Sequence, residues 1–421
     1  MALTGALLLT SVPTASADQV RDDQWPLTAY DAKRVWKISQ GAGVTVAVID
    51  SGVDASQSDL TGQVLPGKDF SGAGDPHEDS NGHGTGMASL IAGHGHGVNS
   101  SAGVMGLAPK VKILPVRIGF NKDSTELPAG VRYAVDHGAS VINLSIGDPS
   151  AYPGSRAAKA IKYAQEHDVV VVAGTGNDSG TVSYPAALPG VVSVSAVDKG
   201  LNFWDLSNTG KVTVAAPGVG TPQANPTTRS GYAVADGTSG STAYVSAIVA
   251  LLRSKFPDLT AGQIINRLVK SASFLNNEGK KAPDKELGYG IARPGSALTM
   301  NIPAGPEQGP LAQAPSTSTN SGTAAKGTNQ AEKKSSSSGI IFLIAGITAV
   351  VVIGGILFAV FRSRRNGAQG GPGSGVPPQG TGYPPQHPTY PPAQQPHPNS
   401  TPNQTYPNPY SQQHPHQGQW E

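Results

Sequence analysis

One run of residues, Asp236 to Leu252, most limits what this chain can fold into. It starts as the turn Asp-Gly-Thr-Ser-Gly and continues as a predicted helix in which nearly every side chain is small or apolar. A helix that is apolar on all sides is buried through a domain, because it has no polar face for water. Ser239 lies where the turn becomes the helix. It is either a helix cap or a nucleophile at the positive end of the helix dipole, and the rest of the chain decides between these.

Predicted strands and helices alternate through the middle of the chain. Runs of β-branched and other apolar residues predict strands at 44–49, 111–118, 140–145, 168–172, 191–196 and 212–216. Helices are predicted over 83–93, 128–138, 155–167, 260–271 and 294–299. Alternation at this spacing is typical of βαβ units, so the sequence predicts an α/β fold with a doubly wound parallel sheet flanked by helices.

The N-terminal end has the composition of an export signal. The apolar run 2–10 and the small residues Ala15-Ser-Ala17 predict a signal peptide over 1–17, although no Lys or Arg precedes the run. An N-terminal extension over 18–43 then leads into the folded domain, which is predicted at 44–302.

Beyond residue 302 the composition changes again. Pro, Ser and Gly predict a flexible linker over 303–338. Residues 339–361 carry no charge, and a helix of that length exceeds about 30 Å, so we expect a single transmembrane helix there. Three arginines follow it, which predicts that the tail, 362–421, is cytoplasmic and that the folded domain lies outside the cell membrane. The tail is rich in Pro, Gln and Tyr and is expected to be disordered.

The composition also excludes several kinds of site. The chain has no cysteine, so it has no thiol nucleophile, no disulfide and no cysteine-bound metal. Its net charge of +2 gives no reason to expect a nucleic acid partner. Acidic loops such as 75–81 lack a diagnostic ligand spacing, and no metal or cofactor is predicted.

Four polar residues lie where such a fold places chemical groups. Asp50 and Asn177 each follow a predicted strand, and His83 begins a predicted helix of small residues, as Ser239 does. Taken alone, each has a structural explanation; Asp50, for example, could simply cap a turn. Together they are the groups of acyl transfer: a nucleophile, a general base, a carboxylate that orients the base and an amide donor for the oxyanion. No Gly-x-Ser-x-Gly elbow surrounds Ser239.

Four motifs contain these residues: Val46-Ala-Val-Ile-Asp50-Ser-Gly-Val-Asp54, Asn81-Gly-His83-Gly-Thr-Gly-Met-Ala-Ser89, Val171-Val-Ala-Gly-Thr-Gly-Asn177 and Gly237-Thr-Ser239. In that order they are similar to the aspartate, histidine, oxyanion and serine motifs of the subtilisin-like (S8) serine proteases. The resemblance extends from about residue 25 to about residue 300. It implies a subtilisin-like fold and peptide-bond hydrolysis.

The resemblance also implies a role for each residue. Ser239 would attack the scissile carbonyl, and His83 would take its proton and pass it to the leaving amine. Asp50 would hold His83 in the correct tautomer, while the side chain of Asn177 and the backbone N–H of Ser239 would stabilise the oxyanion. The residues expected beside the substrate backbone and the first specificity pocket are Ser145, Ile146, Gly147 and Gly174.

The layout of the chain is similar to that of the mycosins, the membrane-anchored subtilases of actinobacterial type VII secretion systems. Gln24-Trp25-Pro26-Leu27 and Ala32-Lys-Arg-Val-Trp36 resemble the mycosin lead-in, which wraps the catalytic domain. This resemblance implies a peptide or protein substrate and a partner in the type VII secretion machinery. The domain would then be an active endopeptidase or a structural stabiliser of a secretion complex, and a general cell-surface protease would fit the triad equally well.

The sequence departs from the family pattern in two places. Gly240-Ser-Thr-Ala243 follows the serine where the family usually has Met-Ala-(Ser/Ala)-Pro, so the first helical turn lacks the usual proline. The stretch between Ala17 and Asp50 is also too short for the folding prodomain of most secreted subtilisins. Neither departure removes a side chain that the resemblance makes catalytic.

Overall fold

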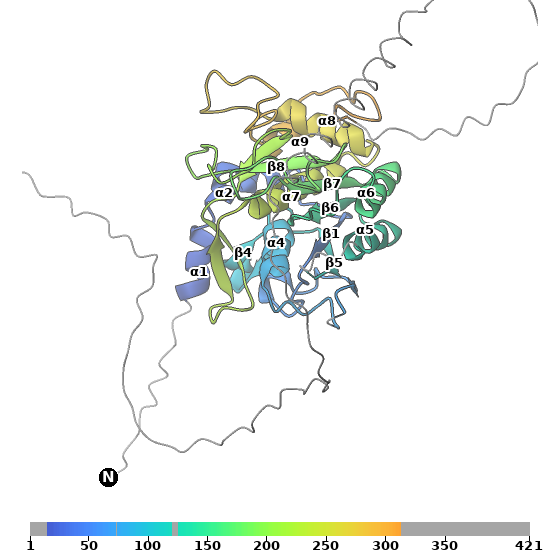
Figure 1. Cartoon of the computed structure of the whole chain (residues 1–421). Coiled ribbons are helices and arrows are strands. Elements are labelled where there is room, and N and C mark those ends of the chain that lie inside the picture. The colour runs from blue at the N-terminus through green and yellow to red at the C-terminus, as the bar shows by residue number, and fades with distance from the viewer. Residues whose placement is uncertain (1–14, 73, 120–124, 313–421) are drawn as a thin grey trace, which may run out of the picture. The chain divides into compact units, whose positions relative to one another are not determined.

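The computed structural model describes residues 15–72, 74–119 and 125–312 (Figure 1). The predicted transmembrane helix at 339–361, the tail at 362–421 and most of the predicted signal peptide and linker lie outside the described residues. Within the described ranges, no helix is long and apolar enough to cross a membrane.

A parallel sheet of seven strands forms the centre of the domain, in the order β2-β5-β1-β6-β7-β8-β9 (Figure 1). Its strands are β1 (Thr45–Asp50), β2 (Lys68–Asp69), β5 (Lys112–Arg117), β6 (Val141–Leu144), β7 (Val170–Gly174), β8 (Val192–Val197) and β9 (Val214–Pro217). β1 pairs with β5 on one side and β6 on the other. From β6 the chain winds outward through β7 and β8 to β9, whereas on the other side β5 lies between β1 and the edge strand β2. The predicted α/β fold with a parallel sheet is therefore confirmed. A crevice for a site is expected where the winding reverses, at the carboxyl ends of β1 and β6.

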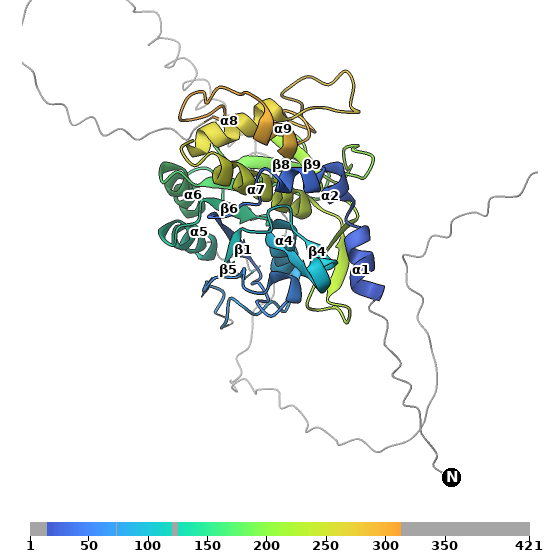
Figure 2. The ribbon, with the colours of Figure 1, turned by 180° about the vertical axis from the view of Figure 1, so that it is seen from behind.

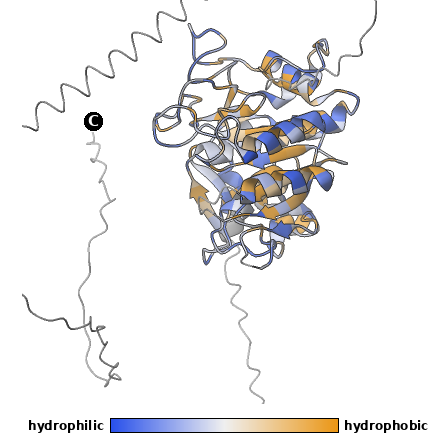
Figure 3. Ribbon diagram, turned by 45° about the vertical axis from the view of Figure 1, so that its right-hand side comes forward, coloured by the Kyte–Doolittle hydropathy of each residue, from blue (hydrophilic) through white to orange (hydrophobic). Residues whose placement is uncertain are grey.

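Helices cover both faces of this sheet. The helices α5 (Glu126–Asp136) and α6 (Arg156–Glu166) lie side by side on one face (Figures 1 and 2), and Figure 3 shows hydrophobic strands behind their hydrophilic outer surfaces. The other face is covered by α4 (His83–Ala92), α7 (Thr238–Lys255), α8 (Ala261–Ser271) and α9 (Pro294–Thr299). Successive side chains of a strand point to opposite faces, and because both faces are covered, every position of β6, β7, β8 and β9 is buried. In β1, for example, Val46 and Val48 pack toward α7, whereas Ala47 and Ile49 pack toward α5 and α6.

The central helix α7 is buried, as its composition predicts. Every residue from Ser241 to Leu252 is buried, and the serine and threonine hydroxyls among them have partners inside the domain. Ser241 donates to the carbonyl of Ala216 at 2.9 Å, and Thr242 donates to the carbonyl of Thr238 at 2.7 Å. The small residues thus let the helix pass close to the sheet without leaving these hydroxyls unsatisfied.

The lead-in is folded rather than extended. It forms the short helices α1 (Ala15–Asp22), α2 (Trp25–Ala29) and α3 (Ala32–Trp36). The guanidinium of Arg21 donates to three backbone carbonyls, those of Ser100, Ala102 and Gly103. The indole N–H of Trp25 donates to the carbonyl of Val219 at 3.0 Å, and that of Trp36 to Leu107 at 2.9 Å. The described part of the lead-in is therefore bound to the domain by side chains that reach backbone acceptors.

Two small hairpins complete the domain beside the main sheet. One joins β3 (His94–His96) and β4 (Ala102–Met105), and the other joins β10 (Thr221–Ala224) and β11 (Tyr232–Ala235). Two 3-10 turns, at Ser58–Leu60 and Val98–Ser100, lie in the connections. The sequence reasoning had assigned no strand to either hairpin.

The chain continues on the surface of the domain beyond residue 302. Asn266 of α8 donates to the carbonyls of Pro303 and Ala304 at 3.1 Å, and Thr260 donates to that of Glu307 at 2.7 Å. The backbone near Glu307 lies close to Gly262 of α8. A Cβ added at Gly262 would come within 2.3 Å of the carbonyl oxygen of Glu307. The first residues of the predicted linker therefore lie along α8.

Candidate active site

Asp50 and His83 form a hydrogen-bonded pair at the switch point of the sheet. Asp50 ends β1 with no solvent exposure, and its two carboxylate oxygens accept from Nδ1 of His83 at 2.8 and 2.9 Å. The backbone N–H of Ser51 donates to the same carboxylate at 2.8 Å. His83 begins α4, and its side chain is 29% exposed. The bond to Asp50 selects the tautomer with the hydrogen on Nδ1, which leaves the lone pair on Nε2.

The surroundings of His83 favour its charged form. Burial lowers the pKa of His83, but the negative charge of Asp50, the hydrogen bond that His83 donates to Asp50 and the charge of Asp79 outweigh burial and raise that pKa above its usual value. A histidine stabilised as the cation in this way can accept a proton during a reaction and hold it until a leaving group takes it.

Asp79 ties the two halves of this pair together. It is 7% exposed, and its carboxylate accepts from the hydroxyl of Ser51 at 2.8 Å and from the backbone N–H of Gly82 and Thr85 at 2.8 and 2.9 Å. The hydroxyl of Ser51 in turn accepts from the N–H of Gly84 at 3.0 Å. The turn after β1 and the first turn of α4 are thus held by one buried carboxylate. The sequence reasoning placed Asp79 in a loop and missed this role, although an acidic residue just before a helix start is a capping signal.

Ser239 is fixed at the start of α7 by a buried polar network. Its hydroxyl donates to the carbonyl of Ser145 at 3.1 Å, and its own carbonyl accepts from the hydroxyl of Ser145, also at 3.1 Å. Behind Ser145, the amide of Asn143 donates to that hydroxyl at 2.9 Å and accepts from Ser246 at 3.0 Å. The network joins the end of β6 to α7, so Ser239 and the Ser145 loop are positioned together.

Asn177 is oriented by the residue that precedes Ser239. Its Oδ1 accepts from both the backbone N–H and the hydroxyl of Thr238, each at 2.9 Å. An amide whose oxygen is engaged in this way presents its Nδ2 as a donor. Asn177 is exposed, so this donor is accessible beside the positive end of α7, where a developing oxyanion gains most from it.

A cavity of about 340 Å³ lies over these groups. It is lined by Asn81, His83, Ser145, Ile146 and Gly147. Three of the residues expected beside the substrate therefore line the same cavity as the histidine. Gly174, the fourth, is buried at the end of β7, where a Cβ would come within 2.9 Å of the hydroxyl of Thr238. No described residue of the lead-in lines this cavity.

This arrangement defines a class of protein. A serine at a helix start, an Asp–His pair and an oriented amide, gathered at the switch point of a doubly wound sheet, are the groups of a serine hydrolase. The sequence places the class within a family, because residues 41–290 match the subtilase family, peptidase S8. The chain belongs to the subtilase family and is a subtilisin-like serine peptidase.

Known proteins narrow the similarity further. Subtilisin DY from Bacillus licheniformis is 35% identical over 248 residues, which are 56% of this chain and 86% of that protein. The crystal structure of MycP1 from Mycobacterium smegmatis is 29% identical with a TM-score of 0.57, over 68% of this chain and 87% of that one. The structure of the MycP3 protease from the type VII (ESX-3) secretion system is 30% identical with a TM-score of 0.53, over 66% and 88% of the two chains. Mycosins are thus among the solved structures that this chain resembles.

Proposed function

We propose that the chain is a serine endopeptidase anchored in the cell membrane, with its peptidase domain outside the cytoplasm, and that it acts in type VII protein secretion. The observation that carries the catalytic part is the bonded Asp50–His83 pair, whose histidine lines a cavity together with Ser145, the residue that is hydrogen-bonded to Ser239. The secretion part is supported by the similarity to MycP1 and MycP3 and by the folded lead-in.

In the proposed reaction, Ser239 is the nucleophile. Its Oγ attacks the scissile carbonyl carbon as Nε2 of His83 accepts the hydroxyl proton, and Asp50 stabilises the imidazolium that results. The carbonyl oxygen becomes an oxyanion that receives hydrogen bonds from Nδ2 of Asn177 and the backbone N–H of Ser239. His83 then protonates the leaving amine, and a water molecule hydrolyses the acyl-enzyme by the same steps.

The substrate we propose is an extended peptide. The cavity runs along Ser145, Ile146 and Gly147, a segment that follows β6 outside any strand of the described sheet. Its backbone groups can pair with a peptide laid alongside as an added strand. Hydrogen bonds to the peptide backbone give affinity, while the cavity selects among side chains.

Membrane anchoring and location are proposals from the sequence. They rest on the uncharged run 339–361, the arginines that follow it and the export signal pattern at 1–17. Removal of residues 1–17 would leave Arg21 and Trp25 in place, so the lead-in would keep its bonds to the domain.

Two alternatives keep the fold and change the role. The domain would be a structural stabiliser of a secretion complex, or a general cell-surface protease. The folded lead-in and the segment along α8 lie outside the residues that match the family, and both add surface to the domain. This added surface favours the structural stabiliser over the general protease.

Active-site labelling tests the enzyme first. We expect a fluorophosphonate probe to label the full-length protein in membranes, and to fail with Ser239→Ala and His83→Ala. Ser230→Ala, which removes an exposed hydroxyl in the β10–β11 connection, is the matched control and should label normally. No labelling of folded wild-type protein would reject the catalytic proposal.

Secretion separates the enzyme from the scaffold. In the source organism without its own copy, wild-type protein should restore type VII secretion. Failure of Ser239→Ala to restore secretion would show that secretion requires catalysis by this protein, whereas full restoration would support the role of a structural stabiliser.

A further inference from the structure

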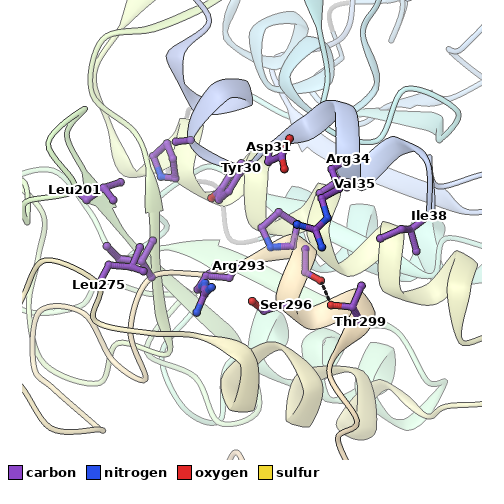
Figure 4. Close-up of a pocket in the computed structure, with 16 residues that line it drawn as sticks. Tyr30, Asp31, Arg34, Val35, Ile38, Leu201, Leu275, Arg293, Ser296 and Thr299 are labelled. Atoms are coloured by element: carbon purple, nitrogen blue, oxygen red, sulfur yellow. Dashed lines mark hydrogen bonds between the residues drawn. The ribbon is translucent and has the colours of Figure 1, made fainter.

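A second cavity, of about 590 Å³, lies between the lead-in and the last helix of the domain (Figure 4). We call it the α3–α9 cavity; its lining includes Tyr30, Arg34, Ile38, Leu275, Arg293 and Ser296. It shares no lining residue with the cavity over His83. Its volume is within the usual range of ligand-binding pockets.

The walls of the α3–α9 cavity come largely from outside the common subtilase domain. One wall is the lead-in from Ala29 to Ile38, and the other includes the start of α9, whereas the family match covers residues 41–290. The cavity exists because the lead-in is fixed to the domain at both ends, by Trp25 and by Trp36. It is therefore a feature added to the peptidase and not a part of the peptidase site.

Two arginines give the α3–α9 cavity its charge. Figure 4 shows the side chains of Arg34 and Arg293 on opposite walls, and both are exposed. Neither has an ion pair or a side-chain hydrogen bond with another described residue, and the acid on the lining is Asp31. Two guanidinium groups without carboxylate partners favour an anionic ligand, and their planar donor pattern suits a carboxylate.

Apolar side chains form part of the lining between the two arginines. Ile38, Leu201 and Leu275 provide apolar surface, and Leu275 is 40% exposed. Tyr30 is 7% exposed, and its hydroxyl has no hydrogen-bond partner among the described residues. Apolar surface between two cations suits a ligand that carries an apolar group beside its acids, which inorganic anions do not have.

We propose that the α3–α9 cavity docks an acidic segment of a partner protein in which carboxylates flank an apolar side chain. The carboxylates pair with Arg34 and Arg293, and the apolar side chain lies against Leu201 and Leu275. Docking at this site leaves the catalytic groups unoccupied, so the protein binds its partner and a substrate at the same time. The inference is independent of the proposed peptidase function.

A peptide pair tests the proposal. The probes are a fluorescein-labelled peptide, Glu-Leu-Glu-Leu-Glu, and its uncharged counterpart, Gln-Leu-Gln-Leu-Gln. Binding is measured by fluorescence anisotropy on the full-length protein in detergent, with Ser239→Ala present so that no probe is cleaved. We expect the acidic peptide to bind and the amide peptide to bind more weakly by a factor of about ten or more. The difference in affinity should shrink as the salt concentration rises from about 50 to 300 mM.

Variants place the binding in the cavity. Arg34→Ala with Arg293→Ala should weaken the acidic peptide by about tenfold or more, because each arginine supplies charge-assisted hydrogen bonds. Tyr30→Phe should weaken it less and in the same direction. Arg156→Ala removes an exposed arginine on α6 and is the matched control that should bind as wild type does. Without Ser239→Ala, the double variant should cleave peptides at the wild-type rate.

Three results would overturn the proposal. They are equal binding of the acidic and amide peptides, acidic-peptide binding that survives loss of both arginines, and the same loss with Arg156→Ala. Binding of inorganic phosphate at millimolar concentration without binding of the acidic peptide would show a site for small anions and would also reject a protein partner.

Discussion

The described residues contain two similar Asp–His pairs, and comparing them shows that the geometry of such a pair does not by itself indicate a catalytic role. Asp50–His83 and Asp59–His96 each join Nδ1 of a histidine to a carboxylate with no exposure, at 2.8 and 2.6 Å. The histidine side chains are 29% and 34% exposed. Distance, burial and residue type therefore do not separate a candidate catalytic pair from any other.

The neighbours of each pair separate them. Around Asp59, the hydroxyl of Tyr232 and the N–H of Val104 donate to the carboxylate at 2.9 and 2.7 Å. The hydroxyl near this second pair is therefore a donor to its carboxylate. Burial and the charge of Asp59 raise the pKa of Tyr232 to about 12, which keeps it a neutral donor. His83 instead lines a cavity together with the Ser145 loop, which holds Ser239 at the end of a helix dipole. The first pair lies beside the loop that is hydrogen-bonded to Ser239, and the second joins a hairpin to the strand β11.

The largest expected difference between the pairs is in catalysis. Ser239→Ala or His83→Ala should lower kcat for a peptide substrate by a factor on the order of 10⁶, since the triad acts as a unit. His96→Ala should leave kcat/KM near the wild-type value. Steady-state kinetics with a chromogenic peptide measure both, and a loss of kcat with His96→Ala comparable to that of His83→Ala would erase the distinction.

The next effect belongs to the oxyanion donor. Asn177→Ala should lower kcat by about 10²–10³ with little change in KM, because Nδ2 is needed only as charge develops on the oxygen. Asn81→Ala removes a different amide, on the lining of the cavity beside His83, and is the matched control. Similar losses of kcat from both variants would mean that the amide of Asn177 is not a specific donor to the oxyanion.

The sequence predicted the features that depend on periodicity and composition. The strand β1 and the helices α8 and α9 were expected within one residue of where they occur. For β1 the reason is that burial on both faces of a parallel sheet imposes a continuous apolar run. Thr260 was expected to open α8, and it forms a capping box with Gln263. Asp50 and His83 were expected to act together, and they are hydrogen-bonded.

Features that depend on contacts between distant segments were not predicted. The helices α2 and α3 have five residues each, too few for a periodic signal, and are held by indole bonds to Val219 and Leu107. Asp79 reaches the site through Ser51, which is 28 residues away in sequence. The segment from Pro303 is held on α8 largely through its backbone carbonyls, so its composition resembles that of a linker.

A stability measurement is expected to show an effect at the second pair, Asp59–His96, where the kinetic measurement shows none. His96→Ala leaves the carboxylate of Asp59 without one of its buried partners and should lower the free energy of unfolding by about 1–3 kcal/mol. Thermal melting with and without the substitution measures this. The free energy should fall less with Tyr232→Phe, by about 1 kcal/mol, because a neutral donor is lost. An unchanged melting temperature for His96→Ala would show that the second pair has no structural role either.

The smallest effect is on the pH dependence of the first pair, and its sign follows from the charges around His83. His83 must be neutral to accept the proton of Ser239, so kcat/KM should fall as pH drops below its raised pKa. Asp79→Asn removes one of the negative charges that raise this pKa, so the pKa should fall and the acidic limb of the profile should move to lower pH. Glu78→Gln, at an exposed neighbouring position, should leave the limb in place because water screens that charge. A limb that moves to higher pH with Asp79→Asn would mean that the hydrogen bonds of Asp79 to the start of α4, and not its charge, set the protonation of the histidine.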